Sequence, residues 1–284
     1  MSKLMKEKLI AYQGTIGANS NLACGKFYAD YESKAFSTFY DVFNEVESGR
    51  AEFGMIPLEN SYAGRVSEIH NLLQDSSLSI VAEHFFPITH NLAAVKGANI
   101  SDIKEVYSHP QALLQSQNSL RELGVEVVES SNTAVSAEYV AKHNDITKAA
   151  LCSKVAADNN GLEIIKENLQ DSGNDNMTIF IVIAKNPSDC EPEISPVITA
   201  MLFTIRNIPG ALYKALGGFA TNHVSIVKLE SYIPGGVSKQ AQFYISIEGH
   251  PNQRNVALAL EELGFFSKSV KLLGVYYADK SRKK

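Results

Sequence analysis

The sequence has few cysteines and no tryptophan. Its three cysteines, Cys24, Cys152 and Cys190, are odd in number and widely spaced among 284 residues, so they favour neither a disulfide framework nor a zinc site. No cysteine–histidine signature surrounds any of them, which argues against a catalytic cysteine. Glu83 and His84 are adjacent, but no third residue follows at a metal-ligand spacing. We therefore expect a reducing, cytoplasmic location and no bound metal.

Long apolar runs and an excess of basic residues are also missing. No run approaches the roughly 20 residues that span a bilayer, and the apolar stretch after the lysine-rich start is too short for a signal peptide. We therefore expect no membrane partner. The formal net charge of −5 argues against nucleic acid as a partner, because binding to phosphates requires a basic face. A small anion can still bind, since a local site can be positive in an acidic protein.

Composition divides the chain into two segments. Residues 186–196, NPSDCEPEISP, hold three prolines, three acids and two serines, which is typical of a linker. The length is sufficient for about two domains. We therefore predict a first domain over residues 1–187, a linker over 188–196 and a second domain over 197–284.

Short apolar runs alternate with helical patterns through the first segment. We predict strands at 8–12, 52–56, 80–86, 91–95, 105–108, 126–128, 149–152 and 180–184. We predict helices near 19–28, 38–47, 66–73, 111–123, 133–143 and 153–159. This alternation indicates a mostly parallel sheet with helices on both faces, in which ligands bind beyond the carboxyl ends of the strands. The segment is large for one sheet, so we expect two α/β lobes around a cleft.

The second segment predicts a small α+β domain. Its pattern is strand 197–205, helix 209–221, strand 224–231, strand 241–248, helix 255–263 and strand 270–277. This βαββαβ order is the ferredoxin-like arrangement. Pro209 falls at the start of the first predicted helix, where proline is tolerated.

The most informative stretch runs from Phe53 to Leu73. Its apolar run ends at Pro57, which cannot donate to a sheet, so we expect the strand to stop there. A polar turn follows, and a helical stripe begins at Val66. The turn contains Glu59, Asn60, Ser61 and Gly64. Free backbone N–H groups at such a turn suit a carboxylate or phosphate, although an ordinary capped βα loop explains the same pattern. Arg65 could clamp a carboxylate, but a solvated helix residue is the favoured interpretation.

Two further turns combine a strand end with a helix start. In residues 12–20, which include Gln13, two glycines allow close backbone approach, and Asn19 or Ser20 could cap the helix. The spacing is not GxGxxG, which argues against a dinucleotide site. In residues 107–113, Pro110 falls near the first helical position, with Ser108 or His109 near the cap. His109 could act as a general acid, but the pattern favours a cap.

Three polar stretches complete the set. Residues 130–134 contain several side chains that can cap a helix. Residues 168–171 and 176–180 place polar groups before the strand predicted at 180–184.

These turns resemble, in order and wording, the motifs of prephenate dehydratases. Pro57 to Val66 matches P-x-E-N-S-x-x-G-x-V. Residues 12–20 are similar to Y-Q-G-x-x-G-A-x-S, and residues 108–113 to S-H-P-Q-A-L. The remaining stretches resemble S-x-T-A, N-I-Q-D and N-x-T-R-F. The resemblance covers residues 8–278. It implies a reaction in which neither a metal nor a cofactor takes part.

The resemblance also implies a fold and an activity. The first domain would be a two-lobed α/β catalytic domain like that of periplasmic binding proteins, with the substrate in the cleft. Prephenate would lose one carboxylate as CO2 and its ring hydroxyl as water, driven by formation of an aromatic ring. Thr178 would donate a hydrogen bond to the leaving oxygen, with Phe180 beside it in the catalytic motif. The implied substrate-binding residues are Gln13, Glu59, Asn60, Ser61, Gly64, His109, Gln111, Thr133, Ala134 and Asn168.

One position departs from the family pattern. Ile179 stands where the N-x-T-R-F motif has arginine, and an isoleucine cannot pair with a carboxylate. This departure keeps open a preference for arogenate, which carries an amine in place of the keto group. A non-catalytic amino-acid sensor is a further alternative, because two α/β lobes also suit ligand-binding proteins. A fusion with chorismate mutase is disfavoured, because only a few residues precede the first predicted strand.

The second domain resembles an ACT domain, a small amino-acid-sensing module. Gly210, Ala211 and Leu212 match the family's G-A-L motif. Glu230 and Ser231 begin the counterpart of its E-S-R-P motif, which lacks the arginine in this chain. The resemblance implies allosteric feedback by L-phenylalanine and assembly into a homodimer or homotetramer.

Overall fold

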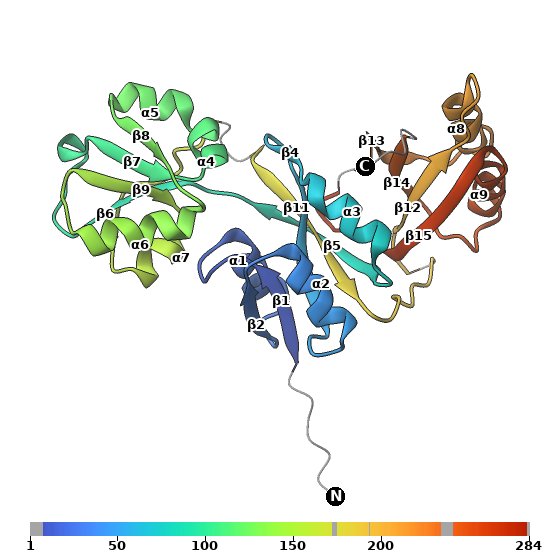
Figure 1. Ribbon diagram of the computed structural model, residues 1–284, viewed down its shortest axis with the longest axis horizontal. Coiled ribbons are helices and arrows are strands. Elements are labelled where there is room, and N and C mark those ends of the chain that lie inside the picture. Colours follow the sequence, from blue (N-terminus) through green and yellow to red (C-terminus); the bar gives the residue numbers. More distant parts are fainter. Residues whose placement is uncertain (1–7, 172–174, 193, 234–240, 283–284) are drawn as a thin grey trace, which may run out of the picture. The chain divides into compact units, whose positions relative to one another are not determined.

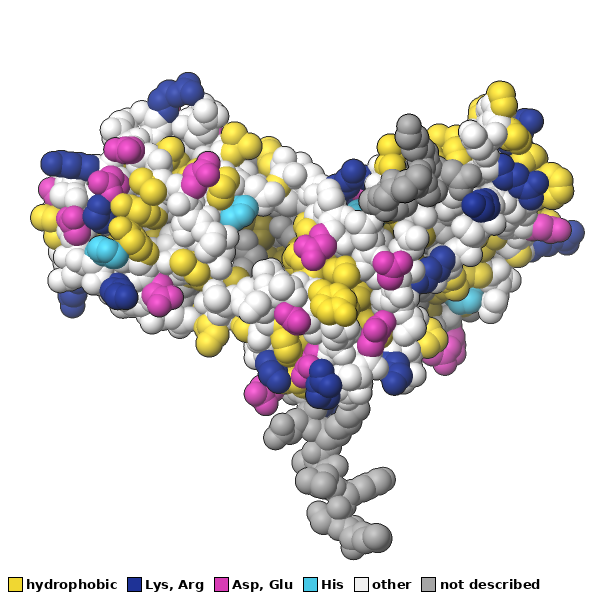
Figure 2. Space-filling view, in the orientation of Figure 1, with side chains coloured by type: hydrophobic (Ala, Val, Ile, Leu, Met, Phe, Trp, Pro, Cys, Tyr) yellow, Lys and Arg dark blue, Asp and Glu magenta, His cyan; other side chains and the backbone are white. Residues whose placement is uncertain are grey.

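The computed structural model describes residues 8–171, 175–192, 194–233 and 241–282 (Figure 1). The chain forms two compact units. One comprises Met1–Val42, Gly54–Val66 and Phe85–Phe180, and the other comprises Phe43–Phe53, Ser67–His84 and Ile181–Lys284. Acidic and basic side chains are interspersed over the face drawn in Figure 2.

The first sheet has the strand order β2-β1-β3-β11-β5, with β4 paired to β3. Its strands are β1 (Leu9–Gln13), β2 (Glu32–Phe36), β3 (Phe53–Asn60), β4 (Gly64–Arg65), β5 (Ser79–Pro87) and β11 (Met177–Ala184). The helices connecting them are α1 (Asn19–Phe27), α2 (Phe39–Glu47) and α3 (Ser67–Asp75). Strands β1 and β2 are parallel. Because β3 and β11 are neighbours in this sheet, residues more than a hundred positions apart lie side by side.

The second sheet has the order β10-β6-β9-β7-β8. Its strands are β6 (Asn91–Ala94), β7 (Glu105–Ser108), β8 (Glu126–Glu129), β9 (Lys148–Cys152) and β10 (Glu163–Lys166). Its helices are η1 (Ile100–Asp102), α4 (Pro110–Gln115), α5 (Gln117–Leu123), α6 (Thr133–His143) and α7 (Lys154–Asn159). Strand β7 is parallel to β8 and β9, whereas β6 is antiparallel to β9 and β10. This sheet is therefore mixed, and the prediction of mostly parallel pairing is wrong for it.

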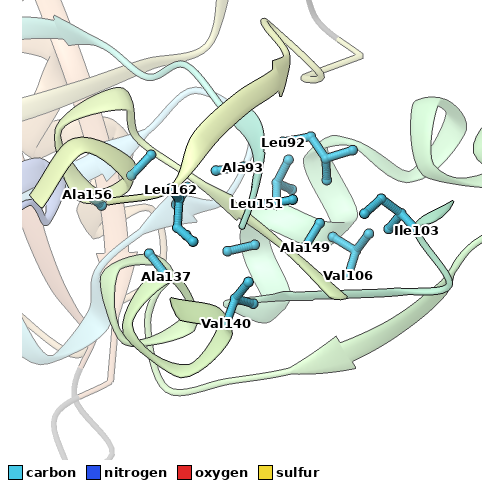
Figure 3. Packing of buried hydrophobic residues seen from close by; sticks show 14 of the residues in the cluster. Leu92, Ala93, Ile103, Val106, Ala137, Val140, Ala149, Leu151, Ala156 and Leu162 are labelled. Carbon is cyan, nitrogen blue, oxygen red and sulfur yellow. The ribbon is translucent and has the colours of Figure 1, made fainter. Parts of the chain in front are cut away.

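Small side chains dominate the core of the second sheet (Figure 3). Ala149 and Leu151 on β9 lie between Leu92 and Val106 of the neighbouring strands, and all four are fully buried. Ala137 on α6 is also fully buried in this cluster. Alanine at such positions lets a helix approach a sheet closely, so the second lobe has a compact core that can hold its loops in place.

The third sheet lies in the second unit and has the order β13-β14-β12-β15. Its elements are β12 (Val197–Ile205), α8 (Ala211–Thr221), β13 (Ile226–Tyr232), β14 (Gln242–Glu248), α9 (Arg254–Phe266) and β15 (Ser267–Tyr277). All pairings are antiparallel. Helices α8 and α9 lie side by side (Figure 1), and Phe219 and Leu263 from them share a buried cluster with Phe203 of β12. The predicted βαββαβ order is confirmed.

Strand β3 does not end at Pro57, as the sequence predicted, but continues to Asn60. A proline removes only its own N–H, and its neighbours keep the strand paired. The chain then turns and returns as β4, with Glu59 opposite Arg65 and Asn60 opposite Gly64. The polar turn is thus the tip of a small hairpin, and α3 begins only at Ser67.

Several further boundaries differ from the predictions. Strand β11 begins at Met177, so Thr178 lies within the strand that was predicted to begin at residue 180. Residues 111–123 form two helices, because the chain breaks at Ser116, whose N–H donates to the carbonyls of Leu113 and Leu114. Helix α8 begins after Gly210, which is left-handed (φ 71°), so Pro209 precedes the helix instead of starting it. Strands β2, β4 and β10 were not predicted. Strand β2 is exposed along most of its length and has no apolar alternation that a sequence pattern could reveal.

Candidate active site

Asn60, the last residue of β3, is the centre of a hydrogen-bond network in the first unit. Its Nδ2 donates to Asn176 Oδ1 (2.8 Å), to the Met177 carbonyl (3.1 Å) and to Thr178 Oγ1 (3.1 Å). Its Oδ1 accepts from the backbone N–H groups of Tyr62 (3.0 Å) and Ala63 (2.9 Å). A single amide therefore joins the hairpin tip of β3 to the start of β11.

Gln115, at the end of α4, extends this network into the second lobe. Its Nε2 donates to Asn60 Oδ1 (3.0 Å), and its Oε1 accepts from Asn176 Nδ2 (2.9 Å). The same Oε1 lies 2.8 Å from His90 Nε2. Asn176 and His90 are 1% and 3% exposed. Buried polar groups require hydrogen-bond partners, and these contacts supply them for both side chains.

Thr178 and Phe180 lie on the same face of β11, because side chains alternate along a strand. Thr178 is 8% exposed, and Phe180 is buried with its ring edge-on to Phe86 (6.1 Å between centroids). Ile179 points to the opposite face of the strand from Thr178. The residue at position 179 therefore does not share the face that carries the Thr178 hydroxyl.

Ser61 connects the hairpin tip to the segment before β11. Its hydroxyl donates to the Asp175 carbonyl (2.9 Å) and accepts from the Met177 N–H (3.0 Å). Its own N–H donates to the Met177 carbonyl (2.9 Å). Glu59 and Gly64 belong to the same hairpin, and Gly64 has a positive φ of 74°, a conformation that favours glycine. The hairpin thus places four of the predicted residues at one end of the first sheet: Glu59, Asn60, Ser61 and Gly64.

Residues 168–171 form hydrogen bonds with His90 and with the start of α5. The Leu169 N–H donates to the His90 carbonyl (2.7 Å), and the His90 N–H donates to Gln170 Oε1 (2.9 Å). The Asp171 carboxylate accepts from the N–H groups of Asn118 (2.8 Å) and Ser119 (3.0 Å). Burial raises the pKa of Asp171, but these hydrogen bonds outweigh it and leave the pKa below its ordinary value. Asp171 therefore caps α5.

Asn168 is the first residue of this segment and is exposed. Its φ is 53°, and its N–H donates to Asn91 Oδ1 (3.2 Å). This contact joins the chain before β11 to the start of β6.

His109 is the N-cap of α4. Its Nδ1 accepts from the Gln111 N–H (3.2 Å), and Pro110 is the first helical residue. The predicted cap is therefore confirmed, and it assigns the ring proton to Nε2. Burial lowers the pKa of His109 against the opposing charge of Glu129, so the ring is neutral near pH 7. The Gln111 side chain is exposed.

The turn between β1 and α1 packs against α7. An ideal Cβ on Gly17, whose φ is 85°, would lie 3.0 Å from Ala156 Cα, so the predicted close backbone approach is confirmed. The Ser153 hydroxyl donates to the Gly17 carbonyl (2.9 Å). The sequence predicted Asn19 or Ser20 as the cap of α1, but neither residue caps it. Its N-cap is Ala18 and lacks a side-chain cap.

The remaining predicted residues stand apart from the Asn60 network. Gln13 donates to the Ser37 carbonyl (3.3 Å). Helix α6 is capped by Asn132, whose Oδ1 accepts from the Val135 N–H (2.8 Å). Thr133 is half-buried beside this cap, and Ala134 is buried in the core of the second sheet. The hydrogen bonds found in the described ranges join none of these residues to Thr178.

The sequence prediction missed His90 and Gln115 as members of the site, and it included Asn176 only as the first residue of the polar stretch 176–180. A signal for Gln115 was present. It lies on α4 among the buried residues Ala112, Leu113 and Ser116, and a glutamine on the buried side of a short helix requires polar partners.

The cysteines take no part in this arrangement. All three are unpaired and buried. Burial raises the pKa of Cys24 and of Cys152 to about 12, so neither is a thiolate near neutral pH. Within the described ranges, no cluster of three His, Cys, Asp or Glu side chains could hold a metal ion, and no helix is long and apolar enough to cross a membrane.

The chain is similar in sequence to proteins of a known family. A family profile described as "Prephenate dehydratase" matches residues 10–188, which contain every residue of the Asn60 network. The chain belongs to the prephenate dehydratase family. The predicted enzyme class, a carbon–oxygen lyase, is thereby confirmed.

Two curated relatives of this dehydratase-family chain are similar over almost its whole length. The "Bifunctional N-acyl-homoserine lactone acylase/prephenate dehydratase" of Komagataeibacter europaeus is 40% identical and covers 98% of this chain and 99% of its own length. The "Arogenate dehydratase/prephenate dehydratase 1, chloroplastic" of Arabidopsis thaliana is 34% identical over 95% of this chain and 72% of its own length. The relatives of this chain therefore differ in their named activities.

A solved structure has the same fold. The prephenate dehydratase of Arthrobacter aurescens in complex with L-Phe is 28% identical, with a TM-score of 0.86, and the match covers 95% of this chain and 90% of that one. The likeness extends through both α/β lobes and the third sheet, since it covers nearly the whole chain.

The predicted allosteric residues of this prephenate dehydratase family member lie in the second unit. Gly210 is the N-cap of α8, Ala211 is buried and Leu212 packs against the cluster beneath the helix. Glu230 on β13 lies 3.3 Å from His70 Nε2 and 3.1 Å from Lys228 Nζ. The next residue, Ser231, is exposed. Residue 234, the proline of the second motif, lies outside the described residues.

Proposed function

We propose that this chain converts prephenate into phenylpyruvate, CO2 and water. The observation that carries the proposal is the 3.1 Å hydrogen bond from Asn60 Nδ2 to Thr178 Oγ1. An amide N–H can only donate, so the threonine oxygen accepts from Asn60 and its own proton points elsewhere. The Thr178 hydroxyl can then donate a hydrogen bond to the substrate.

The chemistry suits such a donor. Prephenate carries two carboxylates and a ring hydroxyl. The bond to the ring carboxylate breaks, its electron pair enters the ring, and the hydroxyl leaves from the opposite ring position. The leaving oxygen takes a proton from the solvent to become water, and a hydrogen bond from Thr178 stabilises the charge that develops on it. A threonine hydroxyl is a weak acid, so we assign it a hydrogen bond instead of full proton transfer. The aromatic product supplies the driving force, and the residues described need no cofactor for this step.

The test is the formation of phenylpyruvate from prephenate by the native chain, by Thr178→Ala and by Thr178→Ser. We expect Thr178→Ala to lower kcat by about 10²- to 10³-fold, the effect of removing one hydrogen-bond donor to a developing negative charge, and Thr178→Ser to retain much of the activity. Turnover that is equal in Thr178→Ala and the native chain would contradict the role of Thr178. No turnover by the native chain would contradict the proposed function.

Arogenate is the alternative substrate. The Arabidopsis relative is named for both dehydratase activities, and Ile179 replaces the arginine of the family motif. Since position 179 faces away from Thr178 along β11, we propose that prephenate remains the preferred substrate. The ratio of kcat/KM for prephenate and arogenate measures this preference. Ligand binding without turnover of either would indicate a non-catalytic sensor.

Hydrolysis of N-acyl-homoserine lactones is a second candidate activity. It is favoured by the 40% identity to the Komagataeibacter europaeus protein, which extends over 98% of this chain. The test is the release of a fatty acid and homoserine lactone from a long-chain N-acyl-homoserine lactone. Activity that survives in Thr178→Ala would show that the two reactions use different groups. Absence of release by the native chain would exclude this candidate.

We further propose that residues 197–284 form an ACT domain that binds L-phenylalanine and inhibits the enzyme. This proposal is supported by the βαββαβ order of that segment and by the L-Phe complex of the related structure. The effector-binding residues would be Gly210, Ala211, Leu212, Glu230 and Ser231. ACT ligands usually bind between paired domains, so we also propose a homodimer or homotetramer. Inhibition of phenylpyruvate formation by phenylalanine, together with light scattering, tests both parts.

The remaining assignments form part of the same proposal. Residues 1–187 would be the catalytic domain, with a periplasmic-binding-protein-like cleft, and residues 188–196 the linker. The substrate would contact Gln13, Glu59, Asn60, Ser61, Gly64, His109, Gln111, Thr133, Ala134 and Asn168, with Thr178 and Phe180 at the reacting end. The three unpaired cysteines support a cytoplasmic location. Alanine substitution at each polar position, scored as KM against kcat, tests the set.

A further inference from the structure

We infer that His90 is a positioning residue, which acts through Gln115 and Asn60 to keep the Thr178 hydroxyl free to donate to the substrate. This inference rests on the proposed dehydratase function. His90 has no place in the motifs that identify the family, and it lies before β6 with no direct hydrogen bond to Thr178 among the described contacts. Its influence would travel through two side-chain amides.

The direction of every hydrogen bond in this chain of contacts follows from two backbone groups. The N–H groups of Tyr62 and Ala63 both point at Asn60 Oδ1, and an N–H can only donate. Asn60 Oδ1 is therefore an acceptor, and Asn60 Nδ2 is the donor to Thr178 Oγ1.

The same logic extends to His90. Since Asn60 Oδ1 accepts, the Gln115 atom 3.0 Å from it must be the donor Nε2. Gln115 Oε1 then faces His90 Nε2 at 2.8 Å and accepts a proton from it. The imidazole must carry its proton on Nε2. The tautomer of His90 and the orientation of the Asn60 amide are therefore coupled through the Gln115 amide.

The opposite tautomer would disrupt this arrangement. A proton on Nδ1 alone would leave the Nε2 lone pair facing Gln115 Oε1, and the Gln115 amide would have to rotate. Its Oε1 would then face Asn60 Oδ1, which is already fixed by two backbone donors. Two oxygens in contact without a proton between them are repulsive in a buried site. His90 therefore adds its donor to the one arrangement that the Tyr62 and Ala63 N–H groups favour, and it holds the Gln115 amide in place beside Asn60.

His90 is itself held firmly. It is 3% exposed. Its N–H donates to Gln170 Oε1 (2.9 Å), and its carbonyl accepts from the Leu169 N–H (2.7 Å). Burial lowers its pKa, against a smaller opposing effect of the hydrogen bond to Gln115. The ring is therefore a neutral donor, and residues 169–170 fix its position from the backbone.

The experiment compares His90→Gln with His90→Leu in the full-length chain. A glutamine can place an N–H near the position of Nε2, whereas leucine fills the space without a donor. We expect His90→Leu to lower kcat for prephenate by about 10- to 100-fold with little change in KM, and His90→Gln to recover most of kcat. Val106→Ala, which truncates a buried residue of the second sheet, is the matched control for lost packing. It should lower the melting temperature and leave kcat unchanged.

Two results would overturn the inference. One is an equal loss of kcat in His90→Gln and His90→Leu that follows the loss in melting temperature. The other is a ring proton on Nδ1, measured by ¹⁵N–¹H correlation spectroscopy of the native chain without substrate. The spectroscopic test does not depend on activity. If the native chain fails to turn over prephenate, the proposed function fails, and the His90 tautomer still decides the hydrogen-bond arrangement.

Discussion

Asn60 and Thr178 lie on neighbouring strands of the first sheet, and the Asn60 amide donates to the Thr178 hydroxyl at 3.1 Å. The two residues are 118 positions apart in the sequence. Their contact orients the one hydroxyl that the proposed mechanism requires. A substitution that changes the chemistry of Asn60 without changing its size is therefore the sharpest probe of the site.

Asn60→Asp should lower kcat by about 100-fold or more. A carboxylate cannot donate to Thr178 Oγ1, and it places a negative charge against the acceptors Asn176 Oδ1 and the Met177 carbonyl. We also expect a loss of about 1–3 kcal/mol in the free energy of unfolding, because buried acceptors lose their donor. Steady-state kinetics and urea unfolding measure the two effects. A fully active variant would contradict the role of the Asn60 amide.

Lys271→Met should destabilise the second unit by about 1–3 kcal/mol. The Lys271 ammonium on β15 donates to the carbonyls of Leu73 (2.9 Å), Gln74 (2.7 Å) and Ser76 (2.6 Å). These groups lie at the C-terminal end of α3, where unpaired carbonyls and the negative end of the helix dipole attract a cation. Chemical denaturation measures the loss. Lys214→Met, at an exposed position of α8, is the control and should change stability by less than about 0.5 kcal/mol.

Arg282→Met should cost about 3 kcal/mol of stability. Glu83 on β5 is 3% exposed, and its two oxygens accept from Arg282 Nε (2.7 Å) and Nη2 (2.6 Å). Removal of the guanidinium leaves a buried carboxylate without its counter-charge. The double variant Glu83→Met with Arg282→Met removes both charges and should recover most of the stability. Equal melting temperatures for the single and double variants would contradict this account.

Gly17→Ala should destabilise the first unit by about 1–3 kcal/mol. Gly17 has a φ of 85°, and a Cβ there would lie 3.0 Å from Ala156 Cα. The change therefore adds backbone strain and forces the β1–α1 turn away from α7. Gly25→Ala is the matched control, since a Cβ at that exposed position of α1 meets nothing within 4 Å. It should instead stabilise the helix by about 0.5–1 kcal/mol. Thermal unfolding of the two variants distinguishes these opposite signs.

Stability should fall as the pH drops from 7 to 5. Burial lowers the pKa values of His84, His90 and His109 in the folded chain. The unfolded chain therefore binds more protons than the folded chain below the ordinary histidine pKa of about 6.5. Since the free energy of unfolding rises with pH wherever the unfolded state binds more protons, stability is complete above that pH and is lost as the pH decreases.

Urea unfolding between pH 5 and 7.5 measures this dependence. His90→Gln removes one of the three groups, so its stability should depend less steeply on pH than that of the native chain. An unchanged slope would show that His90 has the same pKa in the folded and unfolded states.

Local patterns predicted most elements of the fold. Helix α6, strand β7 and strand β12 begin and end where the sequence predicted, because apolar periodicity and capping residues act within a few positions. The exposed strand β2 has no such pattern. Pro57 gave a misleading signal, because the effect of a proline depends on which neighbouring strands pair with it. Sheet pairing is not encoded locally, and this also explains the missed antiparallel pairing of β6.

The sequence by itself indicated most of the segments that become helices and strands, and it placed Asn60, His109 and Thr178 in the polar stretches beside them. Only the tertiary structure decided which of these residues meet. Asn60 reaches Thr178 because β3 and β11 pair, and it reaches Gln115 because α4 ends beside the hairpin tip. His90 joins them because residues 169–170 fix its backbone. Side-chain amides and imidazoles form hydrogen bonds only over about 3 Å, so a network of this kind depends on long-range packing that no local pattern specifies.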